Sequence, residues 1–320
     1  MFVSYAQNAE DVVLARAFAG RTTGLYVDVG AAHPVDHSVT KHFYDLGWRG
    51  VNVEPHTGFF ELLELHRPGD VNVHAGVAAE PGRLTFFVGP VHHPGGSTFD
   101  PDVAGRLEES GLAMRSVDAE VTTLAAVLEA HVGDRAVDFL KVDVEGRELE
   151  VLEGADWSRW RPTVVLVEAI DPVTRERSDK AWAHVLTGAG YRAVLFDGVN
   201  LFFAQEDDVE TAERLAAPAN FCDDFVPAAV VEQESNFALE LWRARDRSAL
   251  LEHQVAVLRA ELAERDERLG RLSGELGELA RRLPAAEAEA GAARAELAAV
   301  RATRWWRLGR LPRLARRLIP

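Results

Sequence analysis

The sequence predicts an α/β fold, a Rossmann-like, seven-stranded sheet with an antiparallel hairpin at its end, followed by an α-helical coiled coil. Three observations predict it. Short apolar runs alternate with helix-like stretches through the first two thirds of the chain, which is typical of a parallel sheet covered on both faces. The pair Asp197-Gly198 between two later apolar runs predicts a tight hairpin turn. From Phe237 onward the apolar residues follow a heptad spacing instead.

Seven apolar runs are the predicted strands, because turn residues bound them and β-branched or aromatic residues fill them. They are residues 24–29, 49–54, 71–78, 137–144, 162–169, 191–196 and, antiparallel after the hairpin turn, 199–204. The predicted helices lie between them, at 38–47, 57–66, 122–132, 147–153 and 178–189. This alternation predicts one doubly wound domain over residues 1–232.

Residues 233–303 are predicted to form a coiled coil interrupted near Pro284. The apolar seam alternates in steps of three and four, with Arg265 on it. Its members before the proline are Phe237, Leu241, Ala244, Leu251, Val255, Leu258, Leu262, Leu269, Leu272, Leu276, Leu279 and Leu283. Because proline breaks or kinks a helix and the register then resumes, we expect two helical segments. A leucine stripe this regular favours a homo-oligomer over a solitary, solvated helix.

Charge is spread unevenly over the net −16 of the 320-residue chain. Residues 233–320 hold 17 Arg against 13 acidic residues, and residues 1–232 hold 18 basic against 38 acidic residues. The acidic body argues against a nucleic-acid partner. Residues 304–320 form a basic tail rich in Trp, Arg and Leu, which predicts peripheral contact with anionic lipid. A flexible tail, or one docked on the acidic body, stays open.

The cellular location is predicted from what the sequence lacks. Cys222 is the single cysteine, the first residues have no signal-peptide pattern, and no run of 18 apolar residues occurs. We expect a cytoplasmic protein whose tail reaches the inner face of the membrane.

The turn after the first strand, "YVDVGAAHP" (26–34), is a candidate ligand site. In an open parallel sheet, ligands bind beyond the carboxyl ends of the strands. A dinucleotide would need the extra glycines of G-x-G-x-x-G to bring its pyrophosphate against the backbone, and only Gly30 is present. We therefore expect Asp28, Gly30 and Ala31 to contact a cofactor with a nucleoside but no pyrophosphate.

Glu54 ends the second strand and completes the predicted cofactor site. A carboxylate in this place can accept hydrogen bonds from both ribose hydroxyls. Either acid alone is as typical of a helix cap or a solvated group. Together with Asp28 on the neighbouring strand, and without a second glycine, it favours S-adenosyl-L-methionine over NAD. The hairpin at Gly198 supports this choice, since it resembles the seventh strand of class I methyltransferases.

Four residues are candidates for catalysis. Asp143 and Glu145 flank one residue at the end of a strand, where two carboxylates can orient or deprotonate a hydroxyl or hold a divalent metal. Glu168 ends the next strand on the same rim, and His33 is a candidate base because imidazole titrates near neutral pH. A capping role for Glu145 and a structural role for His33 stay open. No zinc site is indicated, and we assign no residue to a metal.

These motifs belong to longer blocks that resemble the FkbM-type methyltransferases, in the long form that starts with SYAQN-ED. The blocks are "SYAQNAEDVVLARAF" (4–18), "YVDVGAAHPVDHSVTKHFYDLGWRGVNVEP" (26–55), "STFDPDVA" (97–104), "VTTL" (121–124), "DFLKVDVEGRELEVLEGAD" (138–156), "RPTVVLVEA" (161–169), "GYRAVLFDGVNLFF" (190–203) and "APANFCDDF" (217–225). The resemblance implies a class I fold and S-adenosyl-L-methionine. It implies cofactor contacts from Asp28, Gly30 and Glu54, a reaction centre at Asp143 and Glu145, and Asn8 over the cleft.

The resemblance also implies the acceptor. Such enzymes O-methylate hydroxyls, so we expect a glycan or small-molecule hydroxyl acceptor, in the first place a sugar of a surface polysaccharide or glycan precursor. Leu201 and Phe203 stand where an arginine and a tyrosine are expected, which puts substrate contacts near the hairpin in doubt. The alternatives are a methyltransferase acting on a secondary metabolite, a catalytically inactive coiled-coil scaffold, and an NAD-dependent enzyme.

Overall fold

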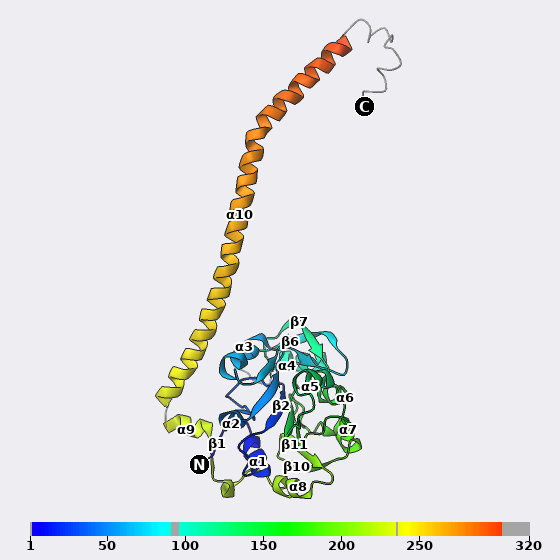
Figure 1. The fold of residues 1–320 in the computed structure, drawn as a ribbon, viewed down its shortest axis with the longest axis vertical. Coiled ribbons are helices and arrows are strands. Elements are labelled where there is room, and N and C mark those ends of the chain that lie inside the picture. The colour runs from blue at the N-terminus through cyan, green and yellow to red at the C-terminus, as the bar shows by residue number, and fades with distance from the viewer. Residues whose placement is uncertain (1, 91–95, 235, 303–320) are drawn as a thin grey trace. The chain divides into compact units, whose positions relative to one another are not determined.

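The structure is a computed structural model of the chain and describes residues 2–90, 96–234 and 236–302 (Figure 1). The chain divides into two compact units, Met1–Arg247 and Ser248–Pro320. The first unit contains the predicted α/β domain, and the second consists of the greater part of one long helix. The limits predicted at 232 and 303 stay predictions.

A mixed, seven-stranded sheet lies at the centre of the first unit, as predicted. Its order is β10-β11-β9-β8-β2-β3-β4. The strands are β2 (Leu25–Val29), β3 (Arg49–Val53), β4 (Val71–Val73), β8 (Phe139–Val142), β9 (Val164–Glu168), β10 (Tyr191–Phe196) and β11 (Asn200–Gln205). β11 is antiparallel to both of its neighbours, β9 and β10. The strands from β9 through β8, β2 and β3 to β4 all pair in parallel. The hairpin is therefore confirmed, and it turns β11 back into the sheet, so that β10 forms the edge.

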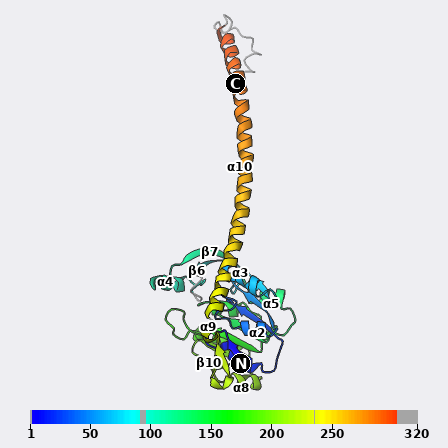
Figure 2. The same ribbon diagram turned by 90° about the vertical axis from the view of Figure 1, so that its left-hand side faces the viewer.

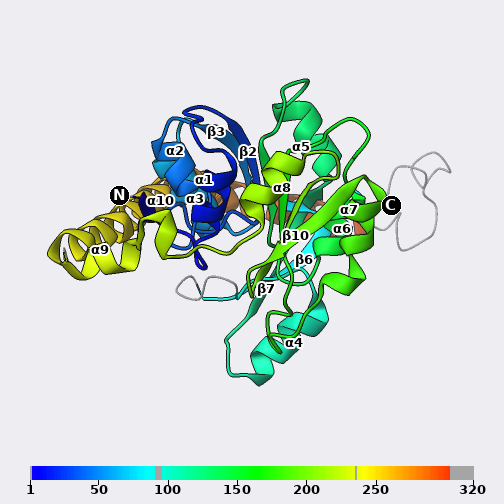
Figure 3. The ribbon, with the colours of Figure 1, turned by 90° about the horizontal axis from the view of Figure 1, so that it is seen from below.

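Helices cover both faces of this sheet because the strand residues alternate between two apolar clusters. In β2, Val27 and Val29 belong to one cluster and Tyr26 to the other. The first cluster includes residues of α5 (Leu124–His131), α6 (Glu148–Glu153) and α7 (Ala183–Gly188). The second includes residues of α1 (Glu10–Ala17), α2 (Lys41–Asp45) and α8 (Val209–Leu215). Figure 3 shows α6 and α7 together and α1 and α2 together, away from them.

A second, three-stranded sheet was not predicted from the sequence. It has the order β5-β7-β6, with β5 (Gly76–Val77), β6 (Gly82–Val88) and β7 (Arg115–Thr122), and α4 (Pro101–Glu109) lies between β6 and β7 in the chain. The single strand predicted over 71–78 is therefore wrong: β4 pairs with β3 and β5 pairs with β7. α5 also begins later than predicted, at Leu124, because the Thr123 side chain accepts a hydrogen bond from the Ala126 amide and caps it.

The remaining elements in the described part of the first unit include a pair of short strands, two further helices and two 3₁₀ turns. β1 (Phe2–Ser4) pairs in parallel with β12 (Phe225–Pro227), which α9 (Ala228–Glu234) follows. The predicted helix at 57–66 is α3 (Thr57–His66), as predicted. The helix predicted over 178–189 is instead a 3₁₀ turn, η1 (Asp179–Ala181), followed by α7, and a second 3₁₀ turn, η2 (Phe221–Asp223), precedes β12.

The helix α10 runs from Asn236 to Ala302 without a break (Figures 1 and 2). The prediction of two helical segments is therefore wrong, because Pro284 lies inside the helix. A proline removes one backbone donor and distorts its turn, which a long helix can accommodate as a bend. Figure 1 shows such a bend in the orange part of α10. The basic tail predicted at 304–320 lies outside the described residues.

The apolar seam of α10 is exposed to solvent along the second unit. The exposed residues include Leu251, Val255, Leu258, Leu262, Leu269, Leu272, Leu276, Leu279 and Leu283. In the described part of the chain, no helix combines the length and the apolar character that crossing a membrane requires.

Candidate methyl-donor and acceptor pocket

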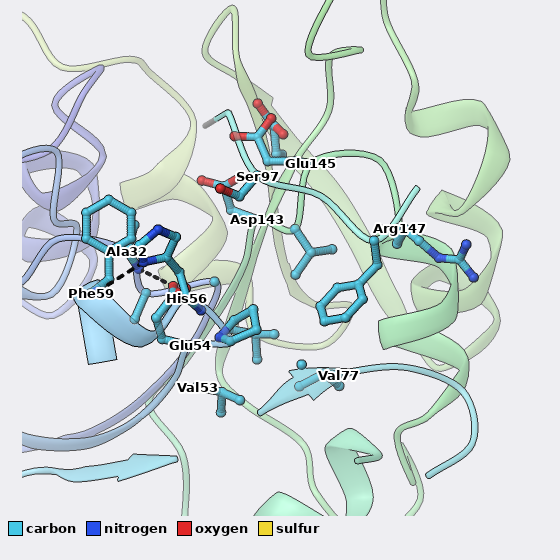
Figure 4. Close-up of a pocket in the computed structure, with 18 of the residues that line it drawn as sticks. Ala32, Val53, Glu54, His56, Phe59, Val77, Ser97, Asp143, Glu145 and Arg147 are labelled. Atoms are coloured by element: carbon cyan, nitrogen blue, oxygen red, sulfur yellow. Dashed lines mark hydrogen bonds between the residues drawn. The ribbon is translucent and has the colours of Figure 1, made fainter. Parts of the chain in front are cut away.

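A pocket opens at the carboxyl ends of the central strands, where ligands bind in open α/β sheets. Its walls come from the segments after β2, β3, β8 and β9, together with residues of the small sheet. The lining includes Gly30, Ala31, Ala32, Glu54, His56, Phe59, Asp143, Glu145, Arg147 and Glu168. Figure 4 shows Glu54, His56 and Phe59 in one part of this pocket and Asp143 and Glu145 in another. The structure thus brings together most of the site residues predicted from the sequence.

Gly30 is required where two strand ends meet. Its φ is +75°, and a side-chain Cβ at this position would lie 1.8 Å from the carbonyl oxygen of Asp143. The backbone amides of Gly30 and Ala31 both donate to the Val53 carbonyl, which fixes the turn against β3. The glycine therefore allows the ends of β2 and β8 to approach each other, and Ala31 and Ala32 continue the turn along the pocket wall.

Glu54 is buried, and the turn fixes both of its oxygens. Oε2 accepts a hydrogen bond of 2.8 Å from the Ala32 amide, and Oε1 accepts one of 2.7 Å from the His56 amide. Burial raises the pKa of Glu54 to about 7, although these two amides act in the opposite direction. Each oxygen keeps a second lone pair, so the rigid carboxylate can also accept hydrogen bonds from a ligand in the pocket.

Asp28 is not among the pocket-lining residues, and its predicted contact with the cofactor stays a prediction. It is buried and faces Lys141, whose ammonium nitrogen is 3.3 Å from Asp28 Oδ1, while Thr40 donates to Oδ2 at 3.1 Å. Burial raises the pKa of Asp28, and the Lys141 ammonium only partly offsets this effect. Asp28 therefore helps to position Lys141, which in turn contacts the Gly30 turn of the pocket.

Lys141 is a site residue that the sequence analysis missed. Its ammonium donates to the Gly30 carbonyl at 2.6 Å and lies 3.4 Å from Asp143 Oδ2, in addition to Asp28. Burial lowers the pKa of Lys141, but the carboxylates of Asp28 and Asp143 outweigh burial and raise it overall. The available signal was a lysine inside an otherwise apolar strand, since a buried lysine needs a charged partner.

Three carboxylates of the pocket lie close together next to Lys141. Oxygens of Asp143, Glu145 and Glu168 lie within 4.8 Å of one another. Burial raises the pKa of both Glu145 and Glu168 well above the usual value, and the neighbouring Asp143 raises both further. The structure therefore places the three predicted catalytic acids at one point of the pocket.

The loop that carries Glu145 is held under strain. Glu145 has a φ of +56°, which is uncommon for a residue other than glycine, and Gly146 follows with +107°. The buried Glu148 accepts hydrogen bonds from the Gly146 and Val144 amides, at 3.0 and 3.4 Å. Ala32, His37 and Arg175 also combine a positive φ with a place in the pocket lining. Strained residues of this kind cluster at functional sites.

His33 and Asn8 are not among the pocket-lining residues. Nδ1 of His33 accepts hydrogen bonds from the Asp36 and Val35 amides, at 2.9 and 3.2 Å, which leaves this nitrogen no lone pair for a substrate proton. Asn8 donates to the Asp197 carbonyl at 3.0 Å instead. The neighbours His37 and Gln7 line the pocket in their place. Motif position alone could not tell which of two nearby polar residues would point inward.

The substitutions at the hairpin are accommodated in the core. Leu201 and Phe203 are buried and pack in the same apolar cluster as β2. They have no place in the pocket lining, so their identity affects the packing of β11 rather than a substrate contact.

A family model described as the methyltransferase FkbM domain matches residues 28–193, which include the end of β2, the acidic cluster and the start of β10. The chain therefore belongs to the FkbM methyltransferase domain family, as the sequence resemblance predicted. It is 33% identical over 118 residues to methyltransferase sdnD of Sordaria araneosa. This alignment covers 30% of the chain and 45% of that relative, so the chain spans less than half of the length of the protein it matches.

Proposed function

We propose that the protein is an S-adenosyl-L-methionine-dependent O-methyltransferase with a class I fold. The strand order supports the fold: β2 lies near the middle, β3 and β4 follow on one side, and β11 enters antiparallel between β9 and β10. The observation that carries the function is that one pocket is lined both by the fixed carboxylate of Glu54 and by the acidic cluster of Asp143, Glu145 and Glu168. Membership of the FkbM family supports the same activity.

The residues around Gly30 fit this methyl donor better than a dinucleotide. The space that a glycine opens for pyrophosphate in a nucleotide turn is taken here by the Asp143 carbonyl. Glu54 would accept hydrogen bonds from the ribose hydroxyls, and Ala31 and Ala32 would lie along the amino-acid part of the donor. When bound, the donor supplies an electrophilic methyl group on a sulfonium, whose leaving group needs no proton.

The acidic cluster supplies what an alcohol acceptor needs. A sugar hydroxyl is a poor nucleophile at neutral pH. A group of the protein must therefore orient the hydroxyl and either accept its proton or make it more acidic. Asp143, Glu145 and Glu168 are positioned to do so, since all three line the pocket. Alignment of the hydroxyl by these rigid groups would provide much of the rate. This need favours O-methylation over transfer to an amine.

The acceptor we propose is a sugar hydroxyl of a surface polysaccharide or of its precursor. The family resemblance supports this choice, and the acidic pocket fits a neutral polyol, which can donate several hydrogen bonds to carboxylates. We further propose that the protein works in the cytoplasm as a homo-oligomer formed through α10, with residues 304–320 in contact with the inner face of the membrane.

The test of the proposed function is ligand binding by the full-length protein. Calorimetry with S-adenosylhomocysteine should give one site per chain, and Glu54→Ala should weaken binding at least tenfold through the lost ribose contacts. Glu120→Ala is the control, because Glu120 is exposed and pairs with Arg83 outside this pocket. No binding of donor or product by the unaltered protein would favour the inactive scaffold, and binding of NADH instead would favour a dehydrogenase.

A further inference from the structure

The acidic cluster at the pocket brings three carboxylates together, and among them Lys141 forms an ion pair with Asp143. Asp143, Glu145 and Glu168 place oxygens within 4.8 Å of one another, and they come from two adjacent strand ends, those of β8 and β9. Carboxylates this close repel one another strongly in a buried site. A stable arrangement needs a cation or protons between them.

Glu168 supplies a second, independent observation. Its side chain is 7% exposed and lines the pocket, yet Oε2 is buried and has no hydrogen-bond partner in the described part of the chain. The buried carboxylates of Glu54 and Glu148 differ, since backbone amides donate to them. A buried carboxylate oxygen without a donor costs free energy unless a ligand satisfies it.

The nearby ammonium is already committed. Lys141 donates to the Gly30 carbonyl at 2.6 Å and forms ion pairs with Asp28 and Asp143 at 3.3 and 3.4 Å, so its ammonium is engaged on three sides. Glu145 and Glu168 receive no hydrogen bond from it among the described contacts. Arg175 also lines the pocket, but no ion pair in the described part of the chain joins it to the cluster. A cation from outside the chain can therefore supply the charge that these carboxylates lack.

We propose that Asp143, Glu145 and Glu168 bind one divalent cation of the Mg²⁺ or Mn²⁺ class. Hard cations prefer carboxylate oxygens, and at Mg²⁺ bond lengths of about 2.1 Å two opposite ligands lie about 4.2 Å apart. The 4.8 Å spread of the cluster requires only a sub-ångström closure of flexible glutamate side chains to reach this geometry. Three protein ligands leave further coordination positions open toward the pocket.

The open positions define the role of the cation. This role rests on the proposed function: the cation holds an oxygen of the acceptor alcohol. An acceptor with two neighbouring hydroxyls can occupy two coordination positions at once. A cation-bound hydroxyl is oriented and is more acidic than a free one. The acceptor class selected in this way is a vicinal diol, the arrangement that sugars present.

The experiment measures cation binding directly on the full-length protein. After treatment with a chelator, Mn²⁺ is titrated and the free ion is followed by electron paramagnetic resonance. One Mn²⁺ per chain should bind, and Glu168→Gln and Glu145→Gln should each weaken binding at least tenfold. Glu210→Gln is the matched control, because Glu210 is exposed and pairs with Arg214 on α8. No saturable binding by the unaltered protein, or binding by both cluster variants as tight as that of the unaltered protein, would overturn the proposal.

The same samples separate this inference from the proposed function. If S-adenosylhomocysteine binds and Mn²⁺ does not, the cation site is disproved and the donor site stands. If Mn²⁺ binds at the cluster and neither donor nor product binds, the cation site stands and the methyltransferase proposal fails. Circular dichroism of each variant shows that the fold is retained, and the Glu145 variant provides an answer if the Glu168 variant does not fold.

Discussion

At the scale of single residues, the site depends on contacts between strand ends that are far apart in the sequence. The Gly30 turn and the Asp143 carbonyl illustrate this dependence, because the glycine leaves room for a backbone atom that comes 113 positions later. Lys141 then links the Gly30 carbonyl to Asp143 and Asp28. The pocket is thus built on a small buried network rather than on independent side chains.

We predict that Gly30→Ala destabilises the protein by about 3 kcal/mol or more. The new Cβ would meet the Asp143 carbonyl oxygen at 1.8 Å, and the φ of +75° is unfavourable for alanine. Urea unfolding followed by circular dichroism measures the change. Gly82→Ala is the control, since a Cβ there has no atom within 4 Å, and its unfolding free energy should change by less than about 1 kcal/mol. Similar values for the two variants would contradict this account.

The sequence predicted the location of the site better than the orientation of its residues. Glu54, Asp143, Glu145 and Glu168 follow strand ends, and strand ends meet at one edge of a parallel sheet. Asp28 was placed at the same edge, but its side chain leaves β2 on the face opposite Val27 and meets Lys141. That partner lies on another strand, so only the folded sheet identifies it.

At the scale of elements, the strongly apolar segments were predicted and the half-exposed ones were not. β8 and β9 are buried throughout, and each gave a clear apolar run. β6 and β7 expose much of their length, and charged or polar residues interrupt the apolar ones in β7, so their pairing with each other determines them. The bend between β4 and β5 was equally hidden, because both segments belong to one apolar run.

The seam of α10 is tested by one substitution at two positions. Val255 lies on the predicted seam and Val257 two residues away on the outer face, and both are exposed in the single chain. We predict that Val255→Glu lowers the oligomer mass measured by light scattering toward that of a monomer, because a buried carboxylate opposes association. Val257→Glu should leave the mass unchanged. Equal behaviour of the two variants would argue for a solitary helix.

At the scale of the whole molecule, the chain joins an acidic catalytic part to a basic end. Residues 301–320 carry seven arginines and no acid, together with Trp305 and Trp306. Arginines attract an anionic bilayer surface, and tryptophans favour its interface. The composition supports the proposed membrane contact.

We predict that deleting residues 301–320 reduces co-sedimentation with vesicles of anionic lipid several-fold. The residual binding should lose its dependence on salt, since the arginines provide the electrostatic attraction. Vesicles of zwitterionic lipid are the control and should bind both proteins weakly. Binding to anionic vesicles that the deletion leaves undiminished would mean that the tail docks on protein instead.

The pairing of β1 with β12 also has a consequence for biosynthesis. These strands lie more than 220 positions apart, so the first-made strand waits unpaired until residues 225–227 have been synthesised. The 67 residues of α10 come next, and at about 5 to 20 residues per second they occupy the ribosome for about 3 to 13 s. Small two-state α/β domains fold faster than this, so the interval leaves time for folding. The catalytic unit can therefore close before the complete seam exists, which protects unfolded chains from being tethered to one another.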